Sequence, residues 1–343
     1  MENMIRSLTS AGAFDQHPFT LVDIGCSGGI SPMWRVFEPH LVAVGIDPVR
    51  EETLRLNADE KNRAVEYVAA FVGLPDDHPF ILQRGNKPFT SNNPWNRLSA
   101  QRAIDILRPQ IAPALRLPLL NDWNESAHAD PVPTRSVSEI AIERNLHNVD
   151  FIKIDIDGRD MDALLSAEAT VRSAPVLGLA LEVNFIGSSD NTDHTFHNTD
   201  RLMRAWGFDL FDLTVRRYSA ASLPQAFRMD KASATELGRP VQGDAVYLRD
   251  PCAWVYAPQT SIELDDSKIL KLACLFELFN LPDHAAELLT ARTATLGGRV
   301  DTSKLLDILA QESQPPSPTV AEHRARFERD PTSFYRSRVQ PPA

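Results

Sequence analysis

The first residues that could do chemistry form a glycine-rich loop with acidic residues on both sides. Asp23 stands just before the loop Gly25-Cys-Ser-Gly-Gly29, and Asp47 follows Gly25 by 22 residues. Glycines let a backbone approach a ligand closely, and an acid at this spacing is placed to accept hydrogen bonds from a ribose diol. The pattern therefore predicts a binding site for a cofactor that contains adenosine.

The loop departs from the fingerprint of dinucleotide-binding proteins. Its glycines follow the pattern G-x-x-G-G, whereas that fingerprint is G-x-G-x-x-G. The carboxylate of Asp23 would also repel a pyrophosphate, whereas a positively charged cofactor would tolerate it. An oxidoreductase that uses NAD(P) on a similar sheet is therefore the less favoured alternative.

A second group of acidic residues follows two later apolar stretches. Asp155 and Asp157 come at the end of the stretch over residues 151–156, and Glu182 comes near the end of the next one. In an open parallel sheet, ligands bind where the carboxyl ends of the strands meet. We therefore expect these side chains at the same edge as the glycine loop. Asp155 and Asp157 could instead cap a helix that begins near Asp160.

Two histidines, His194 and His197, lie in a polar loop after Glu182. An unperturbed imidazole has a pKa of ~6.5 and exchanges protons near neutral pH, which makes His194 the candidate proton acceptor. The alternative is that both histidines are surface or packing residues with no role in catalysis. Asp155, Glu182 and a histidine could also hold a magnesium ion, but we assign no residue as a metal ligand.

The elements that must position these residues alternate along the chain. Short apolar, β-branched runs predict seven strands, over residues 20–24, 41–46, 65–72, 151–156, 175–183, 208–213 and 245–248. Helical patterns lie between them, over residues 50–62, 160–171 and 198–206. Strands that are apolar nearly throughout and alternate with helices predict an α/β fold with a doubly wound, mainly parallel, Rossmann-like sheet.

Other parts of the chain do not follow this alternation. We expect a lead-in over residues 1–19, an α/β domain over 20–255 with an insertion over 74–134, a helical appendage over 262–312 and a polar, proline-rich tail over 313–343. Long insertions are often lids or binding loops, and this one contains one short predicted helix near residues 98–107. The helical appendage either packs on the sheet domain or forms a homodimer interface.

Composition excludes several classes of function. The 343 residues carry 35 basic and 46 acidic side chains, a net charge of -11, so we expect no nucleic-acid partner. No apolar run is long enough to span a bilayer, and residues 1–19 lack the apolar core of a signal peptide, so we expect no integral membrane contact. Cys26, Cys252 and Cys274 are too few and too scattered for a disulfide framework, which favours a cytoplasmic protein.

Five sequence blocks follow one another along the chain: Leu21-Val-Asp-Ile-Gly-Cys-Ser-Gly-Gly29, Val44-Gly-Ile-Asp-Pro48, Val149-Asp-Phe-Ile-Lys-Ile-Asp-Ile-Asp-Gly158, Leu179-Ala-Leu-Glu-Val183 and Gly207-Phe-Asp-Leu-Phe-Asp-Leu213. In this order they resemble the FkbM family of S-adenosylmethionine-dependent methyltransferases. The lysine-containing third block, followed by the Glu182 block, is the specific part. The chain has Cys26-Ser27 where the family commonly has Ala-Asn, Asp47 where it has Glu, and Asp157-Gly158 where it has Glu-Gly. The shorter acids keep their charge.

The resemblance implies a class I methyltransferase fold and O-methyl transfer from S-adenosylmethionine to a hydroxyl of a sugar, glycan or related small molecule. It also implies roles for individual residues. The cofactor would be held by Asp23, Gly25, Cys26, Gly29, Asp47 and Phe71. A hydroxyl acceptor must also lose its proton with the help of a positioned base, and the catalytic candidates at the strand edge and in the loop that follows are Asp155, Asp157, Glu182 and His194. The alternative is a catalytically silent protein that either binds the cofactor or acts as an interaction scaffold.

Overall fold

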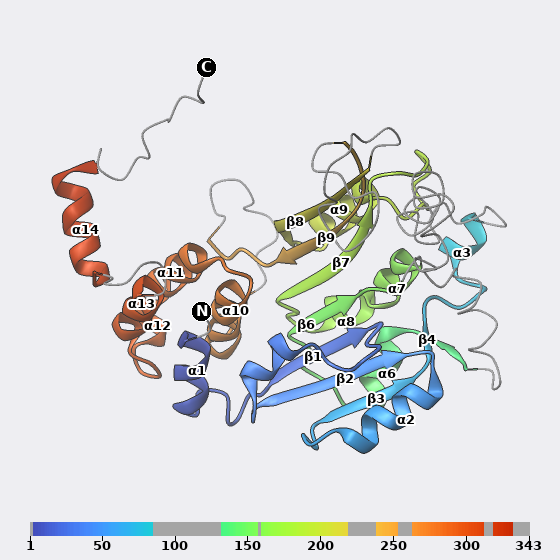
Figure 1. Cartoon of the computed structure of the whole chain (residues 1–343), viewed down its shortest axis with the longest axis horizontal. Coiled ribbons are helices and arrows are strands. Elements are labelled where there is room, and N and C mark those ends of the chain that lie inside the picture. Colours follow the sequence, from blue (N-terminus) through green and yellow to red (C-terminus); the bar gives the residue numbers. More distant parts are fainter. Residues whose placement is uncertain are drawn as a thin grey trace, which may run out of the picture. The chain divides into compact units, whose positions relative to one another are not determined.

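The computed structural model describes residues 3–84, 132–156, 159–218, 238–252, 263–311 and 318–331 (Figure 1). The chain forms two compact units. The α/β unit comprises Phe19–Ser31 and Leu41–Glu263, and the helical unit comprises Met1–Pro18, Pro32–His40 and Leu264–Ala343. The helical unit therefore combines both ends of the chain with one short internal segment.

A seven-stranded sheet forms the centre of the α/β unit, in the order β3-β2-β1-β6-β7-β9-β8. The strands, in sheet order, are β3 (Val65–Ala69), β2 (Leu41–Asp47), β1 (Phe19–Ile24), β6 (Phe151–Ile154), β7 (Gly178–Asn184), β9 (Arg239–Leu248) and β8 (Asp209–Tyr218). The first five run parallel, and β9 runs antiparallel to both β7 and β8. The prediction of a doubly wound, mainly parallel sheet is confirmed.

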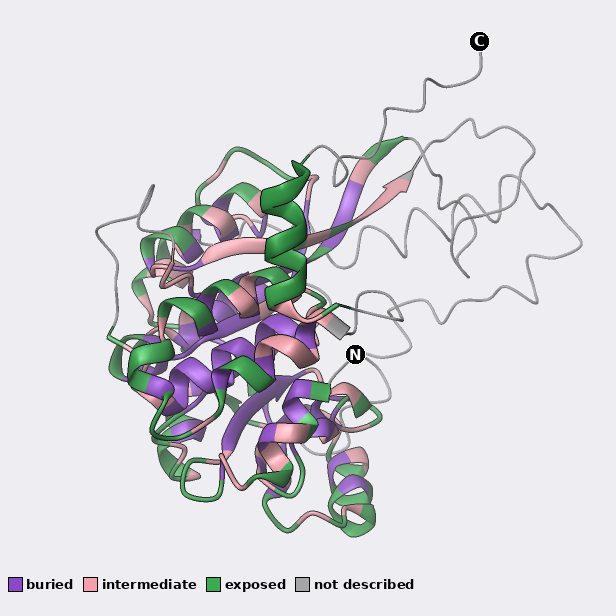
Figure 2. Cartoon of the chain, turned by 90° about the vertical axis from the view of Figure 1, so that its left-hand side faces the viewer, coloured by how far each residue is buried: buried purple, intermediate pink, exposed green. Residues whose placement is uncertain are grey.

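Burial explains why these segments form strands. All six residues of β1 are buried, and only one residue each of β2 and β7 is less than fully buried. Figure 2 shows the buried residues gathered along the central strands. Such strands need apolar side chains on both faces, which is the pattern in the sequence. The flanking helices are α2 (Arg50–Asp59), α6 (Val137–Glu143), α7 (Asp160–Ser166), α8 (Glu168–Ser173) and α9 (Phe196–Ala205).

Several predicted boundaries differ from the structure. The strand expected over 65–72 divides, because β3 ends at Ala69 and β4 (Phe71–Val72) pairs with β5 (Thr134–Arg135) in a separate two-stranded sheet. The helix expected over 160–171 is two helices, α7 and α8. β8 and β9 are both longer than predicted, because polar residues alternate along them and interrupt the apolar pattern that predicts strands.

Of the expected insertion over 74–134, the structure describes the two ends. Its first part forms α3 (Pro79–Arg84). The buried carboxylate of Asp162 accepts a 2.8 Å hydrogen bond from Arg84 and further bonds of 2.9 and 2.7 Å from Arg159. The start of the insertion is therefore fixed to α7. The helix expected over 98–107 lies outside the described residues.

The helical unit is built around one buried helix, α10 (Asp266–Leu278). Every residue from Ser267 to Glu277 is buried. Glu277 is 2% exposed, and its two oxygens accept 2.8 Å hydrogen bonds from the backbone N–H groups of Met4 and Ile5. This carboxylate satisfies donors at the start of a helix that have no partner within the helix. The remaining helices of the unit are α1 (Asn3–Ser10), η1 (Pro32–Phe37), α11 (Pro282–Ala291), α12 (Thr293–Leu296), α13 (Thr302–Gln311) and α14 (Val320–Arg329). In the described part of the chain, no helix has the length and apolar character needed to cross a bilayer.

Candidate functional site

The glycine loop lies at the carboxyl ends of β1, β2 and β6. Asp23 on β1 is in register with Gly45 on β2 and with Lys153 on β6. Three glycines of the loop adopt positive φ angles, +80° at Gly25, +83° at Gly28 and +99° at Gly29. Side chains are strained in this region, so the loop depends on glycine for its shape.

Gly25 also makes a close approach that only glycine allows. A Cβ atom at this position would lie 1.9 Å from the backbone oxygen of Asp155. The Gly25 N–H donates a 2.9 Å hydrogen bond to the carbonyl of Ile46. The loop after β1 is therefore hydrogen-bonded to the end of β2 and in close contact with the end of β6.

Tyr67 on β3 contacts the end of the glycine loop, at Ile30. Its hydroxyl accepts a 3.3 Å hydrogen bond from the N–H of Ile30 and donates a 3.0 Å bond to Glu60. The N–H of Gly28 donates a 3.2 Å bond to Glu52 on α2. Sequence reasoning missed Tyr67 and Glu52, because neither belongs to a motif and both meet the loop only after folding.

Charges of both signs meet beside Gly25. The ammonium of Lys153 lies 3.3 Å from Asp23 Oδ1 and 3.6 Å from Asp155 Oδ2, and it donates a 3.1 Å hydrogen bond to the Gly25 carbonyl. Lys153 therefore forms ion pairs with both acids. Burial raises the pKa of Asp23, and Lys153 opposes that rise. Burial also disfavours the charge on Lys153, but Asp23 and Asp155 outweigh it and raise the pKa of the ammonium.

Asp47 ends β2 next to this loop. The carboxylate is only 4% exposed, and its Oδ1 accepts a 2.8 Å hydrogen bond from the N–H of Val49. Burial raises the pKa of Asp47, while the Val49 bond acts against this shift. Burial and the nearby Asp23 and Asp47 carboxylates raise the pKa of the Cys26 thiol strongly. Cys26 is thus a neutral, small buried residue and not a nucleophile.

These residues fit an adenosine cofactor that carries a positive charge. A Cβ on Gly28 would meet no atom within 4 Å, so the backbone of the loop borders open space. Asp47 offers a carboxylate suited to a diol, and Asp23 and Asp155 add negative charge near the same edge. Phe71, which is 38% exposed on β4, has an accessible aromatic side chain. Its contact with a cofactor stays a prediction.

The second group of predicted residues gathers at the end of β7. His194 is 4% exposed, and its Nε2 lies 3.1 Å from the backbone oxygen of Glu182. Its Nδ1 lies 3.3 Å from the side-chain nitrogen of Asn184 and 3.7 Å from Asp160 Oδ2. The Glu182 carbonyl can only accept a hydrogen bond, so Nε2 is the ring nitrogen that donates one. Nδ1 is the other ring nitrogen, and it faces Asn184 and Asp160.

Glu182 has a charged partner, as its burial requires. It is 8% exposed, and its Oε1 lies 3.4 Å from Arg216 on β8. Arg216 also forms a 2.7 Å ion pair with Asp244 on β9. A buried charge is costly unless it is paired, so this network accounts for an acid at the end of an apolar strand.

The predicted catalytic residues therefore occupy different environments. The side chain of Asp155 is 51% exposed beside the glycine loop, whereas Glu182 and His194 are buried near the end of β7. His197 is exposed and lies 3.5 Å from the Thr195 hydroxyl. Asp157 lies outside the described residues. The sequence placed Asp160 only at the start of a helix. In the structure, this residue also accepts a 3.2 Å hydrogen bond from the Ile156 N–H and faces His194.

The structure gives no support for the magnesium site considered above. Within the described ranges, no three His, Cys, Asp or Glu side chains are grouped closely enough to hold a metal ion.

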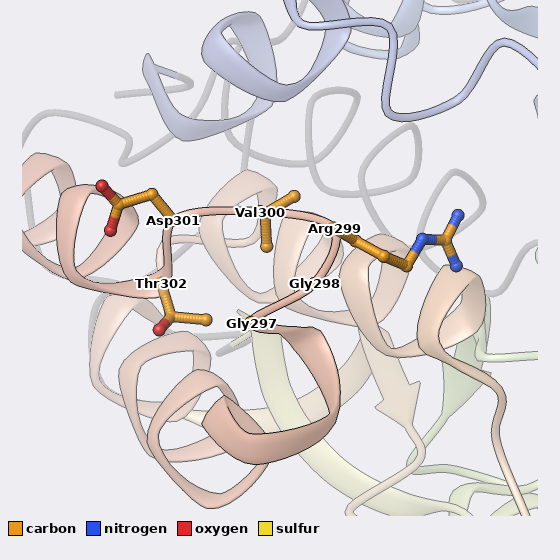
Figure 3. Close-up of a pocket in the computed structure, with 6 residues that line it drawn as sticks. All are labelled: Gly297, Gly298, Arg299, Val300, Asp301 and Thr302. Carbon is orange, nitrogen blue, oxygen red and sulfur yellow. The ribbon is translucent and has the colours of Figure 1, made fainter.

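A hollow of about 430 Å³ lies over residues 297–302 of the helical unit. Figure 3 shows Arg299 and Asp301 extending to opposite ends of this loop, so the hollow does not bring their charges together.

Comparison with known proteins gives one family. The model of the methyltransferase FkbM domain matches residues 32–210, just over half of the chain. No curated protein matches the chain.

Solved structures with similar folds are distant. The magnesium protoporphyrin IX methyltransferase of Synechocystis PCC 6803, solved with bound SAH, is 9% identical, with a TM-score of 0.30, over 72% of this chain and 82% of that one. A TehB-like SAM-dependent methyltransferase from Corynebacterium glutamicum is 12% identical, with a TM-score of 0.28, over 71% of this chain and 93% of that one. These scores are low, so the fold assignment rests on the sheet topology and the family match.

Proposed function

Because the chain belongs to the FkbM methyltransferase family, we propose that it is an S-adenosylmethionine-dependent O-methyltransferase. The observation that carries the cofactor assignment is the glycine loop, which bends through three positive φ angles beside the buried carboxylate of Asp47. When bound, S-adenosylmethionine supplies a methyl group that is already activated on a sulfonium. The acceptor we propose is a hydroxyl of a sugar, a glycan or a related small molecule. The site of action we propose is the cytoplasm, in keeping with three free cysteines.

The protein's own residues must then bind, align and remove a proton. Asp47 would accept hydrogen bonds from the ribose diol, and the open backbone at Gly28 would lie along the cofactor. Asp23 and Asp155 would favour a cationic ligand by their charge. A hydroxyl is a poor nucleophile, so its proton must pass to a positioned base as the new bond forms.

Calorimetric titration tests the cofactor assignment. We expect S-adenosylmethionine and S-adenosylhomocysteine to bind the purified protein in the micromolar range, and NADH not to bind. Methyl transfer to a panel of sugars would then separate an enzyme from a silent scaffold. Binding of NADH alone would overturn the proposal in favour of an oxidoreductase, and binding of none of the three would favour the scaffold.

For the proton acceptor we propose His194, at Nδ1. Asp160 lies 3.7 Å from this atom and would stabilise the imidazolium that forms. Replacing His194 by alanine should lower the rate of methyl transfer roughly 100-fold or more, the usual contribution of a general base. Binding of S-adenosylhomocysteine should change little.

The matched control is His197→Ala, since His197 lies three residues further on and is exposed. That variant should keep its rate. Transfer of labelled methyl groups to an identified acceptor measures both variants. Full turnover by His194→Ala would show that this histidine only packs the end of β7.

A further inference from the structure

The ammonium group of Lys153 lies close to three oxygen atoms. These are the carbonyl oxygen of Gly25 at 3.1 Å, Asp23 Oδ1 at 3.3 Å and Asp155 Oδ2 at 3.6 Å. The contact with the Gly25 carbonyl is a hydrogen bond, whereas the two carboxylates lie at ion-pair distance from the ammonium. Lys153 thereby connects the end of β6 to the loop that follows β1.

The three partners differ in how firmly they are held. The side chain of Asp23 is 3% exposed, and the Gly25 carbonyl belongs to a loop fixed by its hydrogen bond to Ile46. The side chain of Asp155 is 51% exposed, and its distance to the ammonium is the longest. Exposed ion pairs contribute little to stability, so Asp155 is the partner that Lys153 can release at least cost.

The sheet order places Lys153 where the far end of the cofactor would lie. β1 stands between β2 and β6. A ligand whose diol lies at Asp47 on β2, and which extends across β1, therefore reaches the end of β6. There it meets one ammonium and one exposed carboxylate, which suit a ligand end that carries one carboxylate and one ammonium.

We propose that Lys153 is a specificity-determining residue that selects the amino-acid end of the cofactor by an exchange of ion pairs with Asp155. The carboxylate of the ligand replaces Asp155 at Lys153, and the released Asp155 pairs with the ammonium of the ligand. No proton is gained or lost. This inference rests on the proposed function, since it takes the cofactor to be S-adenosylmethionine.

The test compares two ligands that share the nucleoside and differ in the amino-acid end. S-adenosylhomocysteine has that end, and 5′-methylthioadenosine lacks it. In calorimetric titration, Lys153→Met should weaken binding of S-adenosylhomocysteine roughly tenfold or more, as expected for loss of a charge-assisted pair. Binding of 5′-methylthioadenosine should change less than about threefold.

A second variant keeps the proposal testable if Lys153→Met does not fold. Asp155→Asn alters an exposed side chain and leaves Lys153 paired with Asp23, and it should also weaken S-adenosylhomocysteine selectively. Lys153→Arg keeps the charge and should recover part of the affinity. Equal loss for both ligands in both variants would show a merely structural role and overturn the inference. So would unchanged S-adenosylhomocysteine affinity in both. If the unaltered protein does not bind S-adenosylhomocysteine, the proposed function fails first.

Discussion

Gly25→Ala is expected to abolish cofactor binding and to destabilise the α/β unit. The new Cβ would lie 1.9 Å from the backbone oxygen of Asp155, and the residue would also keep a φ of +80°. Backbone atoms cannot move aside as a flexible side chain can, so the ends of β1 and β6 must separate. We expect a loss of at least ~3 kcal/mol in the free energy of unfolding, in the range of severe core substitutions.

Gly28→Ala is the matched control for this prediction. Gly28 has nearly the same φ, +83°, but its Cβ would meet no atom within 4 Å. It should cost only the ~1–2 kcal/mol of a left-handed backbone at a non-glycine residue. Chemical denaturation and titration with S-adenosylhomocysteine measure both variants. Equal destabilisation by the two substitutions would mean that backbone conformation alone, and not the contact with β6, requires glycine at position 25.

Asp47→Asn is expected to weaken cofactor binding while making the protein more stable. Loss of a carboxylate that accepts from a diol should lower the affinity for S-adenosylhomocysteine roughly 10- to 100-fold, the usual effect of losing hydrogen bonds to a charged group. The folded protein, however, no longer has to bury a charge. Asparagine can still accept the hydrogen bond from Val49, so the local turn should persist.

The sign of the pH dependence follows from the raised pKa of Asp47. A carboxyl group whose pKa is higher in the folded protein than in the unfolded chain stabilises the fold as the pH falls, because the folded state then binds more protons. The stability gained by Asp47→Asn should therefore be largest near neutral pH. It should shrink as the pH falls through the raised pKa and vanish below the ordinary value of 3.8, where the wild-type group is neutral in the folded and the unfolded chain alike. Cofactor affinity of the wild type should fall over the same range.

Asp59→Asn provides the control for Asp47→Asn. Its side chain is 68% exposed at the end of α2. Denaturation curves between neutral pH and pH ~4 should show little change for this variant. Lower stability of Asp47→Asn at neutral pH would contradict the argument that burial of the charge dominates at position 47.

The sequence by itself determined the α/β class and most of the candidate cofactor site. Parallel strands buried on both faces need continuous apolar runs, and these are visible without a structure. The glycines and Asp47 sit within short segments next to such strands, so local pattern was enough to place them at one edge of the sheet. The sequence could not fix strand lengths in β8 and β9, where exposed polar residues interrupt the apolar pattern.

Only the tertiary structure decided which distant residues meet at that edge. Gly25 and Asp155 are far apart in the chain, and their contact exists because β1 and β6 are neighbours in the sheet. The same pairing brings Lys153 to Asp23, and the pairing of β2 with β3 brings Tyr67 to the loop. Hydrogen bonds and ion pairs act over a few ångströms, so residues distant in sequence acquire these roles only when the strands that carry them are packed side by side.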